Sequence, residues 1–467
     1  APDDGSGIPI EVPLISSMWL SKKAKQPIAL RWNRDAQGNV RTTVAEKLFA
    51  DGKTRLVRQP QLEIFQPDSE RDVEEGTVAR GTASCPVTGY TTSLPSVKSQ
   101  LVNRHGGTTD ARLFAMYLSS KDSKARFFRL PTDEDLQVVK RAEDSLAIIK
   151  SNLQEAFSPI PTESTADYDS FVNRGPLYGL VTWEDYFLPR QILALVVLSK
   201  LVRRVFETLE PQQESGLLKA IITCLALAVS KQADSSSSFS TWRAASQDIG
   251  HTFGRQALVM TWDFAEANTI SGATRDWSNA VEGGLKALES LDPAIKGGQV
   301  DQADASNHPL ANDSADAYIT DPPYYYSVQY ADLSDFFYVW LRRSLKDIHP
   351  DLFSGPSTPK EREIIVQSPS HAFAPSGKNS QFYESLMSQA MSEGRRILNP
   401  SGIGLVVFAH TSTAGWEVQL QAMIGAGWTI TASWPIDTEM SSRVIAKGRA
   451  VLASSIHLVC LPRENGD

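Results

Sequence analysis

The stretch Ser314–Leu345, which reads SADAYITDPPYYYSVQYADLSDFFYVWLRRSL, decides the fold predicted for this chain. It begins with a short apolar run, Ala317–Thr320, of the kind that forms a buried strand. Pro322 and Pro323 follow, and they cannot continue a sheet ladder because proline lacks a backbone N–H. The chain must therefore turn at the carboxyl end of the strand, where open α/β sheets place their ligands. Beyond the turn, apolar residues at helical spacing predict a helix: Tyr330, Leu333, Phe336, Phe337, Trp340 and Leu341.

The turn itself, Asp321-Pro322-Pro323-Tyr324, suits the chemistry of a nucleobase amino group. The exocyclic amino group of adenine or cytosine is a poor nucleophile, because its lone pair is delocalised into the ring. Acceptors on its two hydrogens favour the pyramidal, nucleophilic form, and the Asp321 carboxylate and the Pro322 carbonyl are candidate acceptors. The prolines hold that carbonyl fixed, and the Tyr324 ring can stack against a base turned out of the duplex. The alternative is a strand-ending turn without chemistry.

The turn resembles motif IV of the amino-group DNA methyltransferases, and Asp at its first position favours the adenine-N6 branch over the cytosine-N4 branch. More narrowly, the chain resembles the large adenine-specific DNA methylases that carry a zinc-ribbon-like insertion. The segments that carry this likeness cover nearly the whole chain: TASCPVTGYTT, GGTTDARL, HTFGRQAL with WDFAEAN, ADLSDFFYVWL, GWTITASWPIDTEM and ASSIHLVC. Members of that family are often encoded near antiphage defence genes.

The resemblance implies a DNA adenine-N6 methyltransferase that uses S-adenosylmethionine and works in antiphage defence or restriction–modification, with defence-complex subunits as further partners. In this role Asp321 and Pro322 accept hydrogen bonds from the target amino group, Pro323 stiffens the turn, and Tyr324 stacks on the base. Asp321 also belongs to the implied cofactor-binding set. No covalent enzyme intermediate is needed, because the amino group itself attacks the sulfonium methyl. A cytosine-N4 or RNA target stays open, since the turn does not read sugar type.

Further positions near the turn have two interpretations each. Asp304, at the end of the preceding predicted strand, resembles the acidic position that approaches the cofactor adenine, and is otherwise a turn-forming residue. Tyr325 and Tyr326 either line the target pocket or belong to the core. His410 follows a predicted strand, so we expect it near the same rim of the sheet.

The composition is that of an ordinary globular protein of 467 residues with a formal charge of -8. This length allows two or three domains. The acidic balance does not by itself support a nucleic-acid partner, although clustered basic residues would.

No apolar run reaches the roughly 18 to 20 residues of a membrane span, so no membrane partner is expected. No signal peptide is visible in a chain that does not begin with Met. Three widely spaced cysteines argue against a disulfide framework and fit a reducing, cytoplasmic location: Cys85, Cys224 and Cys460.

Three domains are predicted from the patterns along the chain. Residues 1–131 are expected to be β-rich, 132–292 to form a helical insertion, and 293–467 to form the methyltransferase catalytic half that carries the turn. The first contains a basic face that either contacts phosphates or is a solvated hairpin: Lys22, Lys23, Lys25, Arg31 and Arg34, with Trp19 and Trp32 nearby. In the second, the HTFGRQAL segment places polar residues that either face the substrate cleft or form a solvated rim: His251, Arg255 and Gln256.

The segment Cys85-Pro86-Val87-Thr88 stands where many relatives have a CxxC zinc knuckle, with Thr88 in place of the second cysteine. A hydroxyl is a poor zinc ligand beside thiolate or imidazole. The chain has no other CxxC. We therefore expect a degenerate zinc-ribbon-like segment that keeps its shape and binds no metal.

The last part of the chain alternates strands and helices. GQVDQADA is predicted as a strand that ends at Asp304, and a helix in FYESLMSQAMSEGRRIL leads through residues 399–402 to the strand IGLVVFAH. Two final strands, WTITASWPI and VLASSIHLVCLP, have no helix between them, which suits a mostly parallel sheet with a terminal hairpin. This ending resembles the methyltransferase fold, whose last strand is antiparallel. We therefore expect an α/β fold with the C-terminal half of a Rossmann-like class I methyltransferase sheet.

One motif implied by the resemblance is missing. Amino-group methyltransferases bind S-adenosylmethionine largely through a glycine-rich turn, Phe-x-Gly-x-Gly, which this sequence lacks; the pair Gly106-Gly107 is a weak signal. We expect another polypeptide or an upstream segment to supply that half, because a parallel sheet cut through its centre exposes an apolar edge. The alternative is a catalytically inactive, methylase-like DNA-binding or scaffolding subunit of a defence complex.

The missing glycine-rich turn predicts that the isolated chain binds S-adenosylmethionine weakly or not at all. Calorimetric titration of the purified chain with the cofactor measures this directly. Tight binding at one molecule of cofactor per chain would contradict the prediction.

Overall fold

The computed structural model describes residues 5–49, 51–79, 81–104, 107–119, 126–153, 157–168, 171–209, 215–325, 328–367, 378–409, 413–436 and 455–463. The chain forms two compact units. Unit 1 comprises Ala1–Asp292 with Asp332–Thr358, and unit 2 comprises Pro293–Ala331 with Pro359–Asp467. The limit placed between 131 and 132 from the sequence lies within unit 1 and stays a prediction.

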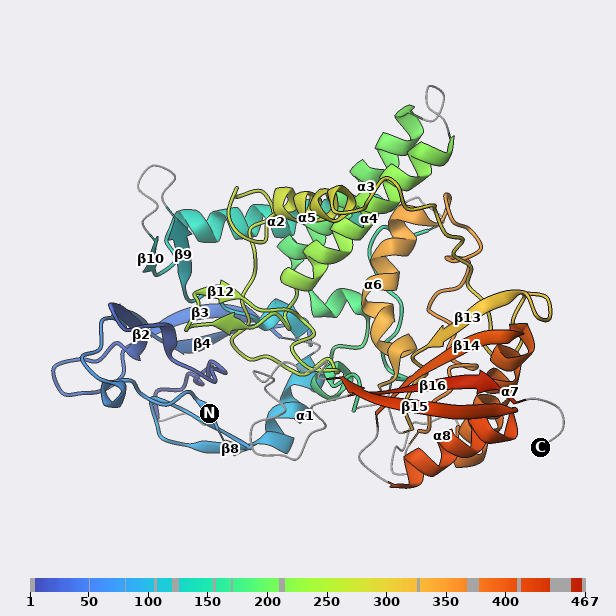
Figure 1. Ribbon diagram of the computed structural model, residues 1–467. Coiled ribbons are helices and arrows are strands. Elements are labelled where there is room, and N and C mark those ends of the chain that lie inside the picture. The colour runs from blue at the N-terminus through green and yellow to red at the C-terminus, as the bar shows by residue number, and fades with distance from the viewer. Residues whose placement is uncertain are drawn as a thin grey trace. The chain divides into compact units, whose positions relative to one another are not determined.

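The first part of unit 1 is built from short antiparallel strands (Figure 1). Strands β1, β2 and β5 form one sheet, β6, β7 and β8 a second, and β3–β4 and β9–β10 form two-stranded sheets. Their bounds are β1 Trp19–Lys23, β2 Gln26–Trp32, β3 Thr42–Leu48, β4 Thr54–Pro60, β5 Leu62–Phe65, β6 Val78–Ala79, β7 Thr82–Ser84, β8 Thr91–Ser93, β9 Met116–Ser119 and β10 Arg126–Arg129. The chain turns back after β2, where Asp35 N donates to Asn39 O at 2.9 Å.

The rest of unit 1 is mainly helical. Its longer elements are α1 Leu94–Arg104, α2 Asp133–Ser151, α3 Pro189–Leu209, α4 Ser215–Ser235, the strand pair β11 Trp242–Arg243 and β12 Asp248–Ile249, α5 Trp277–Glu289 and α6 Tyr330–Leu345. Four 3-10 turns add Glu70–Asp72, Gly107–Asp110, Gly175–Tyr178 and Trp183–Tyr186. Helix α2 begins where the sequence turns helical, because Thr132 and Asp135 form a capping box. The helix predicted after the diproline turn is α6, which brings Phe336 and Trp340 into the core of unit 1.

Helix α4 packs against α3, and the two lie side by side in Figure 1. By length and composition alone, Gly216–Ser235 would also suffice to cross a membrane, and 44% of the tested window is buried inside the fold. Core helices of water-soluble proteins pass the same test, so this finding assigns no location.

Unit 2 contains a four-stranded sheet in the order β13-β14-β16-β15. The strands are β13 Ala315–Thr320, β14 Leu398–Phe408, β15 Trp428–Ile436 and β16 Ser455–Pro462. Strand β13 runs parallel to β14, whereas β16 runs antiparallel to both β14 and β15. The antiparallel pairing of the last two strands agrees with the pattern predicted from the sequence.

Two helices, α7 Ser380–Ile397 and α8 Thr413–Gly425, cover one face of this sheet (Figure 1). The core between them and the strands includes Met387, Met391, Leu398, Val406, Met423, Trp428 and Leu458. Gly394 of α7 lies against the ring of Tyr318 from β13, and that ring stacks on Trp428 with centroids 5.7 Å apart. Because glycine has no side chain, α7 can approach the sheet closely at Gly394.

Two sequence predictions in this unit are wrong. The strand predicted at 298–305 is absent, and only an isolated bridge joins Asp304 to Asn307. Its single branched apolar residue, Val300, is 94% exposed, so no apolar face is present to hold a strand in a sheet. Residues 399–402, predicted as a connection, belong to β14. Pro400 is accommodated there because the pairing with β13 is irregular between Ala315 and Ala317.

Replacing Gly394 with alanine is expected to destabilise unit 2 by about 1–3 kcal/mol, because the new methyl group overlaps the Tyr318 ring. This outweighs the gain of about 1 kcal/mol that alanine normally brings to a helix interior. Gly425→Ala is the matched control, since a Cβ there meets no atom within 4 Å. Denaturant unfolding of both variants gives the comparison, and equal stabilities would contradict the close approach.

Candidate target-base site

The site predicted from the sequence lies at the carboxyl end of β13. That strand ends at Thr320, which pairs with Val406 of the parallel strand β14, so Asp321 is the first residue beyond the ladder. Because the carboxyl ends of parallel strands meet at one edge of a sheet, the end of β14 at Phe408 lies at the same edge. The turn and Phe408 are therefore neighbours, as the ring contact of Tyr324 shows.

Aromatic side chains fix the ring that was predicted to stack on a base. Tyr324 packs edge-to-face on Phe408, with ring centroids 5.4 Å apart and an interplanar angle of 77°. Phe408 in turn packs edge-to-face on Trp416 of α8, with centroids 5.0 Å apart. Such pairs stabilise by about 0.5–1.5 kcal/mol each beyond the area they bury. The row of three rings therefore limits the positions that the half-buried Tyr324 ring can take.

The second proline of the turn is held by a tyrosine from α7. The Tyr383 hydroxyl donates a hydrogen bond to the Pro323 carbonyl at 2.8 Å, and its ring contacts Tyr325 edge-on at 5.0 Å. Tyr383 is buried, and this burial raises the pKa of its hydroxyl well above the usual range. The hydroxyl therefore stays protonated and remains a donor across the physiological pH range.

The two predicted acceptors have no hydrogen-bond partner among the residues that the structure describes. Asp321 is exposed, and within the described part of the chain its carboxylate makes no hydrogen bond or ion pair. Pro322 is buried, and no group among the described residues donates to its carbonyl. Because Tyr383 binds the carbonyl of Pro323 and not that of Pro322, the turn keeps a carboxylate and a carbonyl that no described residue donates to.

Asp304 belongs to a separate polar network. Its Oδ1 accepts hydrogen bonds from the backbone N and the Oγ of Ser306, at 2.9 and 2.7 Å, and Arg362 Nη2 lies 2.6 Å from its Oδ2. The hydrogen bonds from Ser306, assisted by Arg362, lower the pKa of the Asp304 carboxyl. These contacts are those of a turn-forming residue, and a role beside the cofactor adenine stays a prediction.

The remaining predicted positions have different outcomes. Tyr325 is half-buried against Tyr383. Tyr326, His410 and Gly106 lie outside the described residues. In unit 1, Arg255 and Gln256 are exposed, and whether they face a substrate cleft stays a prediction.

The zinc-ribbon-like segment forms a tight turn beside the sheet of β6, β7 and β8. Cys85 is buried, its N–H donates to the Tyr90 carbonyl at 2.8 Å, and its own carbonyl accepts from Gly89 at 2.9 Å. The Thr88 hydroxyl accepts a hydrogen bond from Tyr90 N at 3.3 Å. The threonine therefore stabilises the turn, and no group of three or more potential metal ligands occurs among the described residues.

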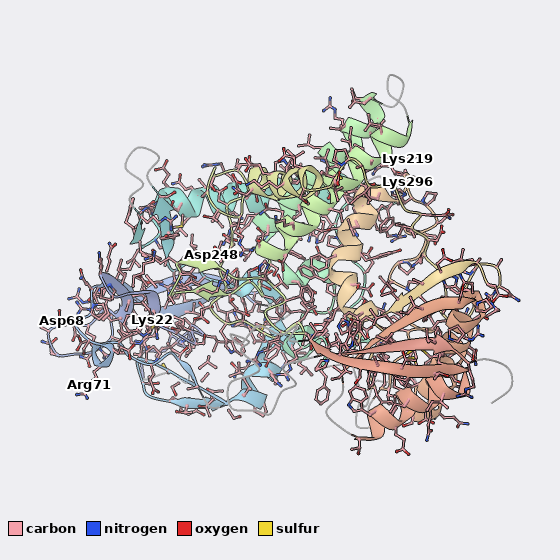
Figure 2. The ribbon with its side chains drawn as sticks, in the orientation of Figure 1. Lys22, Asp68, Arg71, Lys219, Asp248 and Lys296 are labelled. Atoms are coloured by element: carbon pink, nitrogen blue, oxygen red, sulfur yellow. The ribbon has the colours of Figure 1, made fainter. Side chains whose placement is uncertain are left out.

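The predicted basic face is only partly basic in the structure. Arg31 and Arg34 form ion pairs with Glu63 and Glu74. Lys22, labelled in Figure 2, lies over the Trp19 ring with its ammonium 5.1 Å from the ring centre. The positive charge that remains uncompensated on this face is thus at its lysine end.

The sequence did not point to three residues that support the turn: Tyr383, Phe408 and Trp416. Of these, only Phe408 could have been suspected from the sequence, because it lies near the end of the predicted strand IGLVVFAH. The chain matches no known protein-family model. It also matches no curated protein sequence. The functional interpretation therefore rests on the motif and on the geometry around it.

Replacing Tyr383 with phenylalanine is expected to lower the free energy of unfolding by about 1–2 kcal/mol, because the Pro323 carbonyl loses its donor in a largely buried setting. Tyr90→Phe removes a hydroxyl from a residue that is 51% exposed, and should change stability by less than about 0.5 kcal/mol. Denaturant titration of both variants tests the difference. A Tyr383→Phe variant as stable as the wild type would show that the hydroxyl does not hold the turn.

Proposed function

We propose that this chain is the target-base half of an S-adenosylmethionine-dependent DNA adenine-N6 methyltransferase. The observation that carries the proposal is the exposed Asp321 carboxylate, which has no partner among the described residues, beside a diproline turn whose second carbonyl is bound by Tyr383. A structural turn has no need of an unpaired carboxylate and a free carbonyl at the ligand-binding edge of a parallel strand pair. The proposed partners are DNA and the segment or polypeptide that supplies the glycine-rich cofactor loop.

We take the sheet of unit 2 as one part of a Rossmann-like sheet because β13 and β14 run parallel, although its four strands do not by themselves show the Rossmann order. Two parallel strands are followed by a final strand that inserts antiparallel between β14 and β15. Within the described part of the chain, β13 has β14 as its single neighbour, which leaves its outer side open. Ile319 of β13 is 70% exposed, and Ile403 of β14 is 49% exposed. Parallel strands are normally buried on both faces, so an open and apolar edge strand supports a missing complement.

The cofactor would supply an electrophilic methyl group, but this chain alone does not hold it. The sequence lacks the glycine-rich turn, and the Asp304 carboxylate is already bound by Ser306 and Arg362. We therefore derive no step at the cofactor from these residues.

The residues of the turn act on the target amino group. The Asp321 carboxylate accepts one N–H of the adenine amino group and the Pro322 carbonyl accepts the other, which draws the nitrogen toward a pyramidal geometry with a localised lone pair. Tyr324, braced by Phe408, supports the face of the extruded base. Because the prolines fix the Pro322 carbonyl before the base arrives, that acceptor needs little reorganisation when the amino group becomes nucleophilic.

A second candidate is a catalytically inactive, methylase-like DNA-binding or scaffolding subunit of a defence complex. It is favoured by the missing glycine-rich turn and by the engaged carboxylate of Asp304. The open acceptors of the turn argue against it, since a site that is no longer used has no reason to keep them.

The Asp321→Ala variant is expected to lose at least about 100-fold in the rate of methyl transfer, a typical effect of removing one preorganised hydrogen-bond partner of the reacting group. Asp321→Asn keeps an acceptor oxygen and should retain part of the activity. The assay uses DNA, labelled cofactor and the completing polypeptide, and it follows methyl groups incorporated into adenine.

Asp316→Asn is the control for this assay. Asp316 lies near the other end of β13 and binds Asn399 Nδ2 at 2.6 Å, so its loss should leave the rate unchanged. Equal activity in the wild type and Asp321→Ala, or no activity in either, would remove the enzymatic interpretation.

A further inference from the structure

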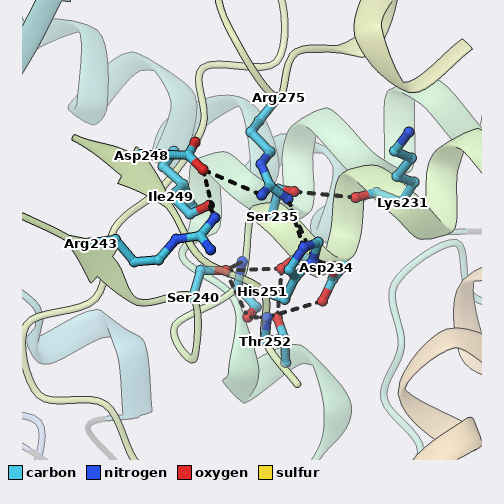
Figure 3. Close-up of polar contacts among 11 residues, drawn as sticks. Lys231, Asp234, Ser235, Ser240, Arg243, Asp248, Ile249, His251, Thr252 and Arg275 are labelled. Atoms are coloured by element: carbon cyan, nitrogen blue, oxygen red, sulfur yellow. Dashed lines mark hydrogen bonds and ion pairs between the residues drawn. The ribbon is translucent and has the colours of Figure 1, made fainter. Parts of the chain in front are cut away.

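Unit 1 gathers charged side chains from several loop segments, separate from the turn described above (Figure 3). Asp234 lies at the end of α4, Arg243 and Asp248 belong to the β11–β12 pair, His251 follows β12, and Arg275 precedes α5. We call these five residues the His251 cluster.

The imidazole of His251 is held in place by Asp234. Its Nδ1 bonds to Asp234 Oδ2, and Oδ1 of the same carboxylate accepts the Thr252 N–H at 3.0 Å. The Thr252 hydroxyl donates to the Asp234 carbonyl at 2.8 Å, which fixes the acidic residue a second time. The ring is therefore oriented through Nδ1, yet the His251 side chain is 54% exposed. The oriented imidazole is exposed, and its Nε2 lies beside Arg275 at this surface.

Arg275 lies beside this ring on a strained backbone. Its Nη1 lies 3.4 Å from both ring nitrogens of His251. Its φ of 73° is left-handed, a conformation that costs a non-glycine residue about 1–2 kcal/mol. The Gln232 side chain donates to the Arg275 carbonyl at 3.2 Å and helps to hold it there. The fold thus accepts strain where it positions a guanidinium against an imidazole.

Arg243 and Arg275 share one carboxylate. Oδ2 of Asp248 lies 2.6 Å from Arg243 Nη2 and 3.6 Å from Arg275 Nη2. Each guanidinium has five N–H donors in a fork that matches phosphate oxygens. A single carboxylate oxygen cannot saturate two such groups, so donors remain for an anionic ligand.

Exposed lysines of β1 lie next to the β11–β12 pair. Lys22 N donates to the Ala244 carbonyl at 2.9 Å, and the Gln247 side chain donates to Ser21 Oγ at 2.8 Å. Lys22 and Lys23 are exposed, and among the described residues no carboxylate lies within ion-pair distance of either. The two arginines of the His251 cluster are balanced by Asp234 and Asp248, so the lysines of β1 supply the net positive charge beside it, in a chain whose formal charge is -8.

We infer that this surface binds the phosphate backbone of duplex DNA. Lys22 and Lys23 of β1, Arg243 of β11 and Arg275 before α5 come from separate segments, and such convergence suits a ligand with repeated negative charges. Backbone contacts of this kind position a duplex without reading its sequence. The choice of DNA over another polyanion rests on the proposed function, whereas the surface itself rests on these contacts.

The test measures binding of the full chain to a fluorescein-labelled 20-base-pair duplex by anisotropy at several salt concentrations. In the double variant Arg243→Gln, Arg275→Gln, the slope of log K against log [salt] should shrink in magnitude by about 1–2, at about 0.9 per lost phosphate contact. Affinity at 0.1 M salt should fall roughly tenfold or more. Arg55→Gln is the matched control. The Arg55 side chain is paired with Asp51 and is 45% exposed, which is close to the 48% exposure of the Arg243 side chain. It should leave the slope unchanged.

A third variant distinguishes the loss of phosphate contacts from a loss of folding. Asp248→Asn removes the carboxylate that competes with phosphate for both arginines, so affinity should rise about twofold to fivefold, the equivalent of one exposed ion pair. A wild-type chain that does not bind the duplex at low salt, or a double variant with the wild-type slope and affinity, overturns the inference. Binding through this surface without methyl transfer, when the completing polypeptide and the cofactor are also present, would refute the proposed function alone.

Discussion

The candidate site depends on one constraint, the fixed path of two successive prolines at the end of β13. Each ring sets φ near -65°, and neither residue can donate to a ladder, so the strand must stop at Thr320. The Tyr383 hydroxyl then holds the second carbonyl. With one carbonyl bound and the other free, Asp321 and Pro322 present acceptors in an arrangement that the rest of the turn cannot readily change. Burial keeps the Tyr383 donor protonated, so this constraint does not depend on pH in the physiological range.

The local features of unit 2 could be predicted because their causes are local. The apolar run before Asp321, the proline break and the helical spacing after it are all written in adjacent residues, and β13 and α6 follow that pattern. The support of the turn could not be predicted in this way. Tyr383 lies 60 positions from Pro323, and nothing in the sequence of its helix indicates that one face contacts a carbonyl of another segment. Such contacts arise only when the sheet brings α7 to the edge of β13.

At Asp304 the error was the opposite, because a local sequence pattern predicted a strand that does not form. An alternation of polar residues around one valine reads as a strand, but a strand also needs an apolar face and a neighbour. Val300 has neither, and the chain instead closes a small turn that ties up the Asp304 carboxylate. The charge balance was equally uninformative, since in a chain with a formal charge of -8 the exposed lysines of β1 lie next to the β11–β12 pair, which is distant in sequence. Neither outcome follows from composition.

The open outer side of β13 has a consequence for how the protein must be produced in cells. A parallel edge strand with an exposed isoleucine offers unpaired N–H and C=O groups to any extended segment nearby, including the same strand of a second molecule. Under the proposed function, synthesis in excess of the completing half would favour self-pairing and insolubility, whereas matched synthesis of the two halves would cap the edge as soon as it forms. In that case a balanced supply of the completing half would serve folding as well as catalysis.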